Sequence, residues 1–108
     1  MYPDLVERFI KYVKMNTRSD EHSTTVPSTQ NQVEFAEMLA KDLEELGLSE
    51  VEHLRETGFV TATLPANTGR EIPTVGFIAH IDTADFNSEN INPQIVENYD
   101  GEEIVLNE

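Results

Sequence analysis

The sequence contains no cysteine, which excludes disulfide bonds, cysteine-based zinc sites and a cysteine nucleophile. Basic residues are also scarce: 7 Lys and Arg stand against 21 Asp and Glu, giving a formal net charge of −14. Such an acidic chain is a poor match for nucleic acid or for an anionic membrane surface. No apolar run approaches the roughly 20 residues that a membrane span needs, and the first residues do not resemble a signal peptide. We therefore expect a cytoplasmic protein with neither kind of partner.

The few basic residues are unevenly distributed. No Lys or Arg follows Arg70, whereas residues 71–108 contain nine acidic residues. One interpretation is an ordinary solvated acidic face. The other is that metal ions or basic residues from outside this stretch face some of the carboxylates, because uncompensated like charges repel one another.

Two stretches have the apolar periodicity of amphipathic helices. The first covers residues 5–13, and Pro3 suits its first turn. A polar loop follows, and Thr29 with Gln32 then fits a capping box at the start of a second helix, which we expect to run to Leu46 and to end at Gly47. The residues expected on its buried face are Val33, Ala36, Leu39, Ala40, Leu43 and Leu46.

Beyond residue 47 the apolar pattern changes to that of β-strands. Strands are expected at residues 51–54, 59–64, 74–79, 94–97 and 103–106. Residues 74–79 form the most apolar stretch, so we expect them to be a buried strand. The fold class predicted is therefore α/β, with two helices covering a mixed sheet.

The last predicted strand, 103–106, is followed by only two residues. Two helices supply little cover for a sheet that contains the apolar stretch 74–79. We therefore expect residues 1–108 to be the amino-terminal portion of a larger catalytic domain, although a small complete domain with a frayed tail stays open. A chain of this kind would expose sheet edges and an apolar face, and we expect it to self-associate.

The sequence His80-Ile81-Asp82 follows the apolar stretch directly. Residues two apart on a strand face the same side, so the Asp82 carboxylate is expected to reach the His80 ring. A carboxylate that accepts the proton of one imidazole nitrogen leaves the lone pair of the other nitrogen free for a metal ion. The spacing alone leaves two possibilities open, namely a metal ligand or a hydrogen-bonded structural histidine.

Several longer segments add a resemblance to a known family. They are RFIKYVKMNTR from Arg8, the stretch 23–35, TLPAN from Thr63, GFIAHIDTADF from Gly76 and NPQIVENYDG from Asn92. With these segments the chain resembles the dizinc metallopeptidases, the family that also contains aminoacylases and carboxypeptidase-type enzymes, and within it the branch of tripeptide aminopeptidases. The resemblance covers nearly all 108 residues.

The resemblance implies a role for both residues of the short motif. His80 matches the first zinc-ligand histidine of the family, and Asp82 matches the catalytic carboxylate that clamps this histidine. The implied cofactor is zinc, with two ions in a complete active site, and the implied substrate is a short peptide. The bridging carboxylate, the catalytic glutamate, the other ligands and the lid domain match no residue here, so the chain alone is expected to be inactive. Related activity on N-acyl amino acids and a non-catalytic binding module stay open as alternatives.

Overall fold

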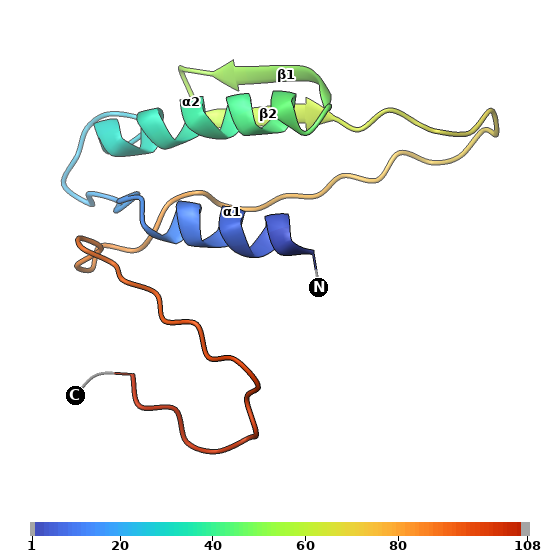
Figure 1. The fold of residues 1–108 in the computed structure, drawn as a ribbon. Helices are drawn as coiled ribbons and strands as arrows, with labels where there is room; N and C mark the ends of the chain where they lie inside the picture. The colour runs from blue at the N-terminus through green and yellow to red at the C-terminus, as the bar shows by residue number, and fades with distance from the viewer. Residues whose placement is uncertain (1, 107–108) are drawn as a thin grey trace.

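The computed structural model describes residues 2–106 of the chain. Helix α1 (Pro3–Val13) is followed by a long loop and by helix α2 (Gln30–Glu45). Strands β1 (Ser49–Leu54) and β2 (Phe59–Thr63) then form an antiparallel hairpin. Figure 1 shows the hairpin on one side of α2 and α1 on the other. The fold class, an α/β chain with two helices, is as expected.

Local sequence signals lie at the start of both helices and just after α2, which ends at Glu45, one residue before the expected Leu46. Pro3 occupies the first turn of α1, where its missing N–H costs no hydrogen bond. At the start of α2, the backbone N–H of Thr29 donates to the side-chain carbonyl of Gln32 at 3.3 Å, which confirms the capping box. Gly47 follows α2 with a φ of 86°, the left-handed conformation that ends many helices.

The two strands of the hairpin pair in a defined antiparallel register. His53 lies opposite Val60, and Leu54 lies opposite Phe59. The turn that joins the strands ends at Gly58, whose φ of 75° favours glycine. Because these strands are adjacent in the sequence, their pairing needs only local contacts.

The buried centre of the described chain is small. Among described hydrophobic residues only Phe35 and Ala36 are buried, both on α2. The Phe35 ring meets the ring of Tyr12 edge-on at 5.5 Å, which joins the two helices. The expected buried face of α2 is therefore partly wrong: Phe35 was not among its residues, and Leu46 is exposed. This face of α2 contacts both α1 and the hairpin. The residues buried on it therefore extend beyond the single row of apolar residues expected from the sequence.

The mixed sheet is not formed within residues 2–106. The structure has one two-stranded antiparallel sheet, and the stretches 74–79, 94–97 and 103–106 are not strands. The side chains of Phe77 and Ile78 are 95% and 101% exposed, so the prediction of a buried strand at 74–79 is wrong for this chain. A strand of this kind needs neighbours at its edges and cover on both faces, and no described segment supplies them.

The chain after β2 makes a long excursion. Figure 1 shows it reaching away from the helices to a turn and returning to the loop between α1 and α2. Residues 89–106 then form an extended tail without helix or strand. No helix among the described residues is both long enough and apolar enough to cross a membrane.

Candidate functional site

Two segments that are far apart in the sequence meet where the excursion returns. The backbone N–H of Thr83 donates to the carbonyl of Thr17 at 3.0 Å, and the N–H of Ser19 donates to the carbonyl of Thr83 at 2.9 Å. The Ser88 hydroxyl adds a hydrogen bond of 2.6 Å to the side-chain oxygen of Asn16. These contacts fix the segment after His80 on the loop between the helices, although the apolar stretch before it stays unpaired.

The imidazole of His80 is held from one side by Asp82. The ring atom Nδ1 lies 2.8 Å from the backbone carbonyl oxygen of Asp82 and 3.1 Å from its carboxylate Oδ1. Both partners only accept hydrogen bonds, so Nδ1 must be the nitrogen that carries the proton. In the neutral ring, Nε2 then carries a free lone pair. The His80 side chain is 85% exposed, so this lone pair faces outward.

The carboxylate of Asp82 is itself fixed by a second contact. The Ser19 hydroxyl donates to Oδ2 at 2.5 Å, while Oδ1 faces the His80 ring. The hydrogen bond from Ser19, and then the one from His80, lower the pKa of Asp82 below its ordinary value of 3.8. Asp82 is therefore ionised at neutral pH, and its two oxygens have separate partners.

The atoms present fit one position of a metal site. A neutral imidazole whose far nitrogen is bonded to a carboxylate is the usual form of a metal-bound histidine in proteins. Catalytic zinc requires at least three protein ligands. In the part of the chain that the structure describes, no group of three His, Cys, Asp or Glu side chains is placed to hold a metal ion. His80 is therefore suited to be one ligand, and the set is incomplete in residues 2–106.

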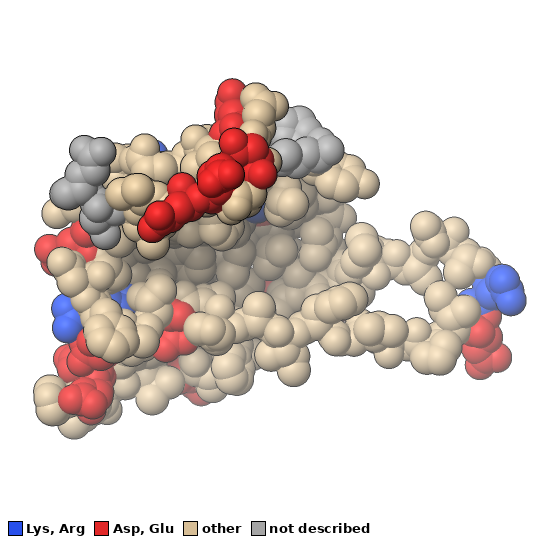
Figure 2. All heavy atoms as spheres, turned by 90° about the horizontal axis from the view of Figure 1, so that it is seen from below, with Lys and Arg blue, Asp and Glu red and all other residues tan. Residues whose placement is uncertain are grey.

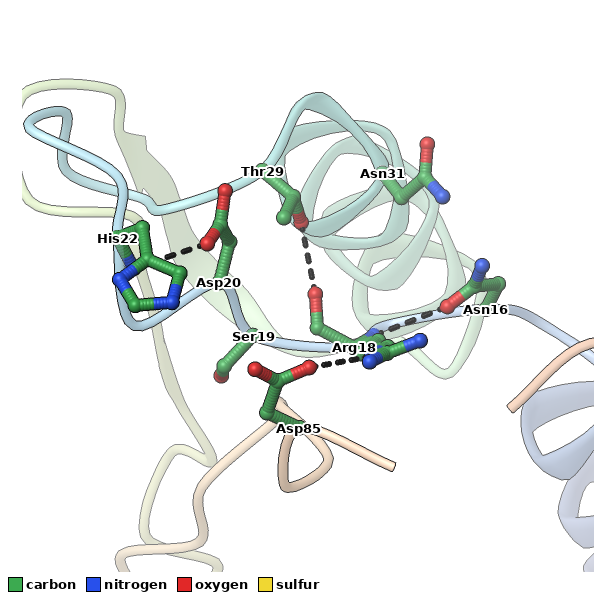
Figure 3. Close-up of a pocket in the computed structure, with 8 residues that line it drawn as sticks. All are labelled: Asn16, Arg18, Ser19, Asp20, His22, Thr29, Asn31 and Asp85. Carbon is green, nitrogen blue, oxygen red and sulfur yellow. Dashed lines mark hydrogen bonds and ion pairs between the residues drawn. The ribbon is translucent and has the colours of Figure 1, made fainter. Parts of the chain in front are cut away.

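A polar pocket of about 370 Å³ has Ser19 among its lining residues (Figure 3). It is lined by Asn16, Arg18, Ser19, Asp20, His22, Thr29, Asn31 and Asp85. Figure 3 shows Arg18 at its centre, paired with Asp85 through an Nε–Oδ1 contact of 2.5 Å. The Arg18 carbonyl also accepts a hydrogen bond from the Thr29 hydroxyl. The pair between Arg18 and Asp85 therefore joins the loop to the segment 83–88.

The pair between Arg18 and Asp85 bears on the uneven charge of the sequence. Arg18 lies outside the acidic stretch and neutralises one of its carboxylates, as the second interpretation of that stretch requires. Figure 2 shows acidic side chains gathered along one edge of the molecule, with only scattered Lys and Arg on that face. Asp85 therefore faces a basic residue from outside the acidic stretch, whereas other acidic residues lie on a solvated face.

The loop residues Ser19, Asp20, His22 and Ser23 resemble a catalytic triad only in composition. The Ser19 hydroxyl faces Asp82, and Asp20 accepts a hydrogen bond from the backbone of His22. The His22 side chain is solvated, whereas His53 is half-buried in β1. Sequence reasoning also missed Ser19 as a neighbour of Asp82, since 63 residues separate them and no local pattern links them.

Comparison with models of known protein families gives no match for this chain. Curated proteins do match it. Peptidase T of Fusobacterium nucleatum is 63% identical over 106 residues, which are 98% of this chain and 26% of that protein. Peptidase T of Enterococcus faecalis is 59% identical over 105 residues, 97% of this chain and 26% of that protein.

A third relative shows the same pattern of coverage. Peptidase T of Caldanaerobacter subterraneus is 62% identical over 104 residues, 95% of this chain and 25% of that protein. The chain thus spans about a quarter of the length of the curated relatives that it matches. Over nearly all of its 108 residues, the chain is therefore related by sequence to the matching quarter of the Peptidase T proteins.

Proposed function

We propose that this chain contributes one metal ligand, His80, and the carboxylate that positions it, Asp82, to a zinc-dependent aminopeptidase that releases the first residue of tripeptides. The observation that carries the proposal is the orientation of the imidazole. The backbone carbonyl oxygen of Asp82 lies 2.8 Å from Nδ1 and its carboxylate Oδ1 lies 3.1 Å from it, while Nε2 of the exposed ring faces outward. The relation to proteins named Peptidase T supplies the reaction class, a peptide hydrolysis.

The chain's own residues have defined tasks in such a site. His80 would donate its Nε2 lone pair to the metal ion, and the negative charge of Asp82 would make that nitrogen a stronger donor. The contact with Asp82 also prevents the ring from rotating, so the lone pair stays aimed at one position. When bound, zinc would polarise the scissile carbonyl and lower the pKa of a bound water.

The remaining parts of the active site would lie outside this chain. Residues 2–106 offer no set of three metal ligands, and the relatives are about four times as long as the match. We propose that the other zinc ligands, the second zinc ion and a glutamate that takes the proton from water belong to that further length. The 108-residue chain alone would then be inactive on tripeptides.

A chimera tests this proposal directly. The chain would replace the matching 106 residues of the Fusobacterium Peptidase T, to which it is 63% identical. The chimera should bind zinc and release the first residue of a tripeptide. Replacement of the ligand by His80→Ala should lower zinc affinity and activity by at least about 100-fold, while removal of the positioning carboxylate by Asp82→Ala should lower zinc affinity about 10–100-fold.

His22→Ala provides the matched control, because it also removes an exposed imidazole from this chain. This variant should retain zinc content and activity. Zinc content measured by elemental analysis gives a readout that does not depend on turnover. Full zinc content and activity in the His80→Ala chimera would contradict the proposed ligand. Cleavage of N-acyl amino acids in preference to tripeptides would contradict the proposed substrate, and tripeptide cleavage by the 108-residue chain alone would contradict its inactivity.

A further inference from the structure

We infer that Ser19 is a positioning residue for the metal-ligand histidine: its hydroxyl, oriented by the Gln32 side chain, fixes the Asp82 carboxylate that holds the His80 ring. The inference rests on the proposed function for its meaning in catalysis. Its geometry is independent of any metal, because every contact lies within the described chain.

The orientation begins at Gln32, which is 5% exposed. Its side-chain oxygen accepts hydrogen bonds from the Thr29 backbone N–H at 3.3 Å and from the Ser28 hydroxyl at 3.2 Å. Its amide nitrogen faces the carbonyl of Thr17 at 3.3 Å. A backbone N–H only donates and a carbonyl only accepts, so these partners determine which end of the amide is oxygen and which is nitrogen.

The amide nitrogen of Gln32 also determines the direction of the Ser19 hydroxyl. It donates to Ser19 Oγ at 3.1 Å, so the hydroxyl acts as acceptor on that side. The hydroxyl proton must then point to the other neighbour, Asp82 Oδ2, at 2.5 Å. The hydrogen bond to an ionised acceptor is of the stronger, charge-assisted kind.

The last link joins Asp82 to the ring. With Oδ2 bonded to Ser19, the carboxylate cannot rotate freely, and Oδ1 stays 3.1 Å from His80 Nδ1. The main-chain contacts of Thr83 with the loop hold the backbone around Asp82 in the same place. The first turn of α2 is thus connected to His80 through two long-range hydrogen bonds. Gln32 and Ser19 are 13 positions apart in the sequence, and Ser19 and Asp82 are 63 positions apart.

The tautomer of His80 in the 108-residue chain is the direct test. Nitrogen NMR of ¹⁵N-labelled histidine distinguishes a protonated from an unprotonated ring nitrogen, and the spectra would be recorded at about pH 8, where free imidazole is neutral. In the unsubstituted chain, His80 should have its proton on Nδ1. In Ser19→Ala, the Nδ1 resonance should shift, because the Asp82 carboxylate is then free to turn away and only the Asp82 backbone carbonyl, at 2.8 Å, still accepts the Nδ1 proton. Ser19→Thr, which retains a hydroxyl, should restore the original spectrum.

Ser88→Ala is the matched control. It also removes a serine hydroxyl that joins the two segments, but this hydroxyl bonds to Asn16 and not to Asp82. If Ser88→Ala shifts the His80 resonances as much as Ser19→Ala does, or if Ser19→Ala leaves them unchanged, the inference is overturned. Should circular dichroism show that Ser19→Ala has lost its helices, Ser19→Cys takes its place. A cysteine keeps the volume with a much weaker donor, and an unshifted His80 in that variant likewise overturns the inference.

A second measurement connects Ser19 to the proposed function and keeps the two separable. In the Peptidase T chimera, Ser19→Ala should weaken zinc binding by about 10-fold, measured by competition with a chelator, and Ser88→Ala should not. A chimera that binds no zinc, while Ser19→Ala in the 108-residue chain still shifts the His80 resonances, contradicts the proposed function alone. Unchanged zinc affinity in Ser19→Ala, in a chimera that does bind zinc, contradicts the positioning role.

Discussion

At the scale of single residues, Asp42 shows how α1 and α2 are joined. Its carboxylate is buried on α2 and accepts hydrogen bonds from Lys11 Nζ at 2.6 and 2.7 Å and from the Tyr12 hydroxyl at 2.9 Å. Burial raises the pKa of Asp42, but these hydrogen bonds outweigh burial and the pKa lies below 3.8. On the other side of the contact, burial and the bond to Asp42 raise the pKa of Tyr12 to about 12.

The lowered pKa of Asp42 predicts a loss of stability in acid. The unfolded chain, with the higher pKa, binds the proton more readily than the folded chain. The stabilisation is therefore complete above the unfolded value near 3.8 and is lost as the pH falls through the folded value. We expect Asp42→Asn to lower the free energy of unfolding by about 1–2 kcal/mol near pH 7. The difference between variant and parent should shrink below about pH 4, as urea titrations followed by circular dichroism would show.

Glu44→Gln is the control for this prediction. It removes one carboxylate charge from an exposed position on the same helix. Its effect should remain within about 0.5 kcal/mol. An Asp42→Asn variant as stable as the parent at neutral pH would show that the helices are joined by apolar contacts alone.

At the scale of elements, the turn of the hairpin packs against the loop before α2. Gly58 has a φ of 75°, and a Cβ atom added there would lie 2.5 Å from Cγ of Pro27. Such a separation is shorter than a normal carbon contact, so one of the two segments must move. The absence of a side chain at Gly58 therefore serves both the turn and the packing of the hairpin.

We accordingly expect Gly58→Ala to destabilise the chain by about 2 kcal/mol or more, from left-handed backbone strain and overlap together. Thermal unfolding followed by circular dichroism would measure the change. Gly69→Ala is the control, since φ there is not left-handed and no atom lies within 4 Å of the added Cβ. Equal melting temperatures for the two variants would contradict the packing of the turn on Pro27.

At the scale of the whole molecule, the described chain is extended. Its radius of gyration is 17.3 Å, compared with about 13 Å for a compact domain of this length. Large apolar side chains, Phe77 and Ile78 among them, are almost fully solvent-exposed. An exposed apolar segment whose backbone groups are not paired in a sheet is a surface that other chains can pair with.

This exposure predicts that the 108-residue chain self-associates. Light scattering should give a mean mass that rises with protein concentration. Ile78→Lys should reduce the rise, because a charge on the exposed apolar segment opposes pairing between chains. Lys41→Ala, at an exposed position on α2, is the comparison and should leave association unchanged. A strictly monomeric parent at high concentration would contradict the prediction.

Much of the structure follows from the sequence alone, because the interactions responsible are local. The bounds of α1 and α2, the capping box at Thr29 and the turn at Gly58 depend on residues within a few positions of one another. The contact between His80 and Asp82 is of the same kind, since the two residues are only two positions apart. Backbone sterics and short-range hydrogen bonds specify such features whatever the rest of the chain does.

Only the tertiary structure decided the contacts between distant segments. Ser19 is hydrogen-bonded to Asp82, 63 positions away, and Lys11 is hydrogen-bonded to Asp42, 31 positions away. No pattern in the sequence predicts either pair. The stretch 74–79 shows the opposite case: its apolar pattern predicted a buried strand, but its side chains are exposed. Apolar periodicity sets the tendency of a segment to form a strand, whereas burial requires neighbours that cover its faces and accept its backbone hydrogen bonds.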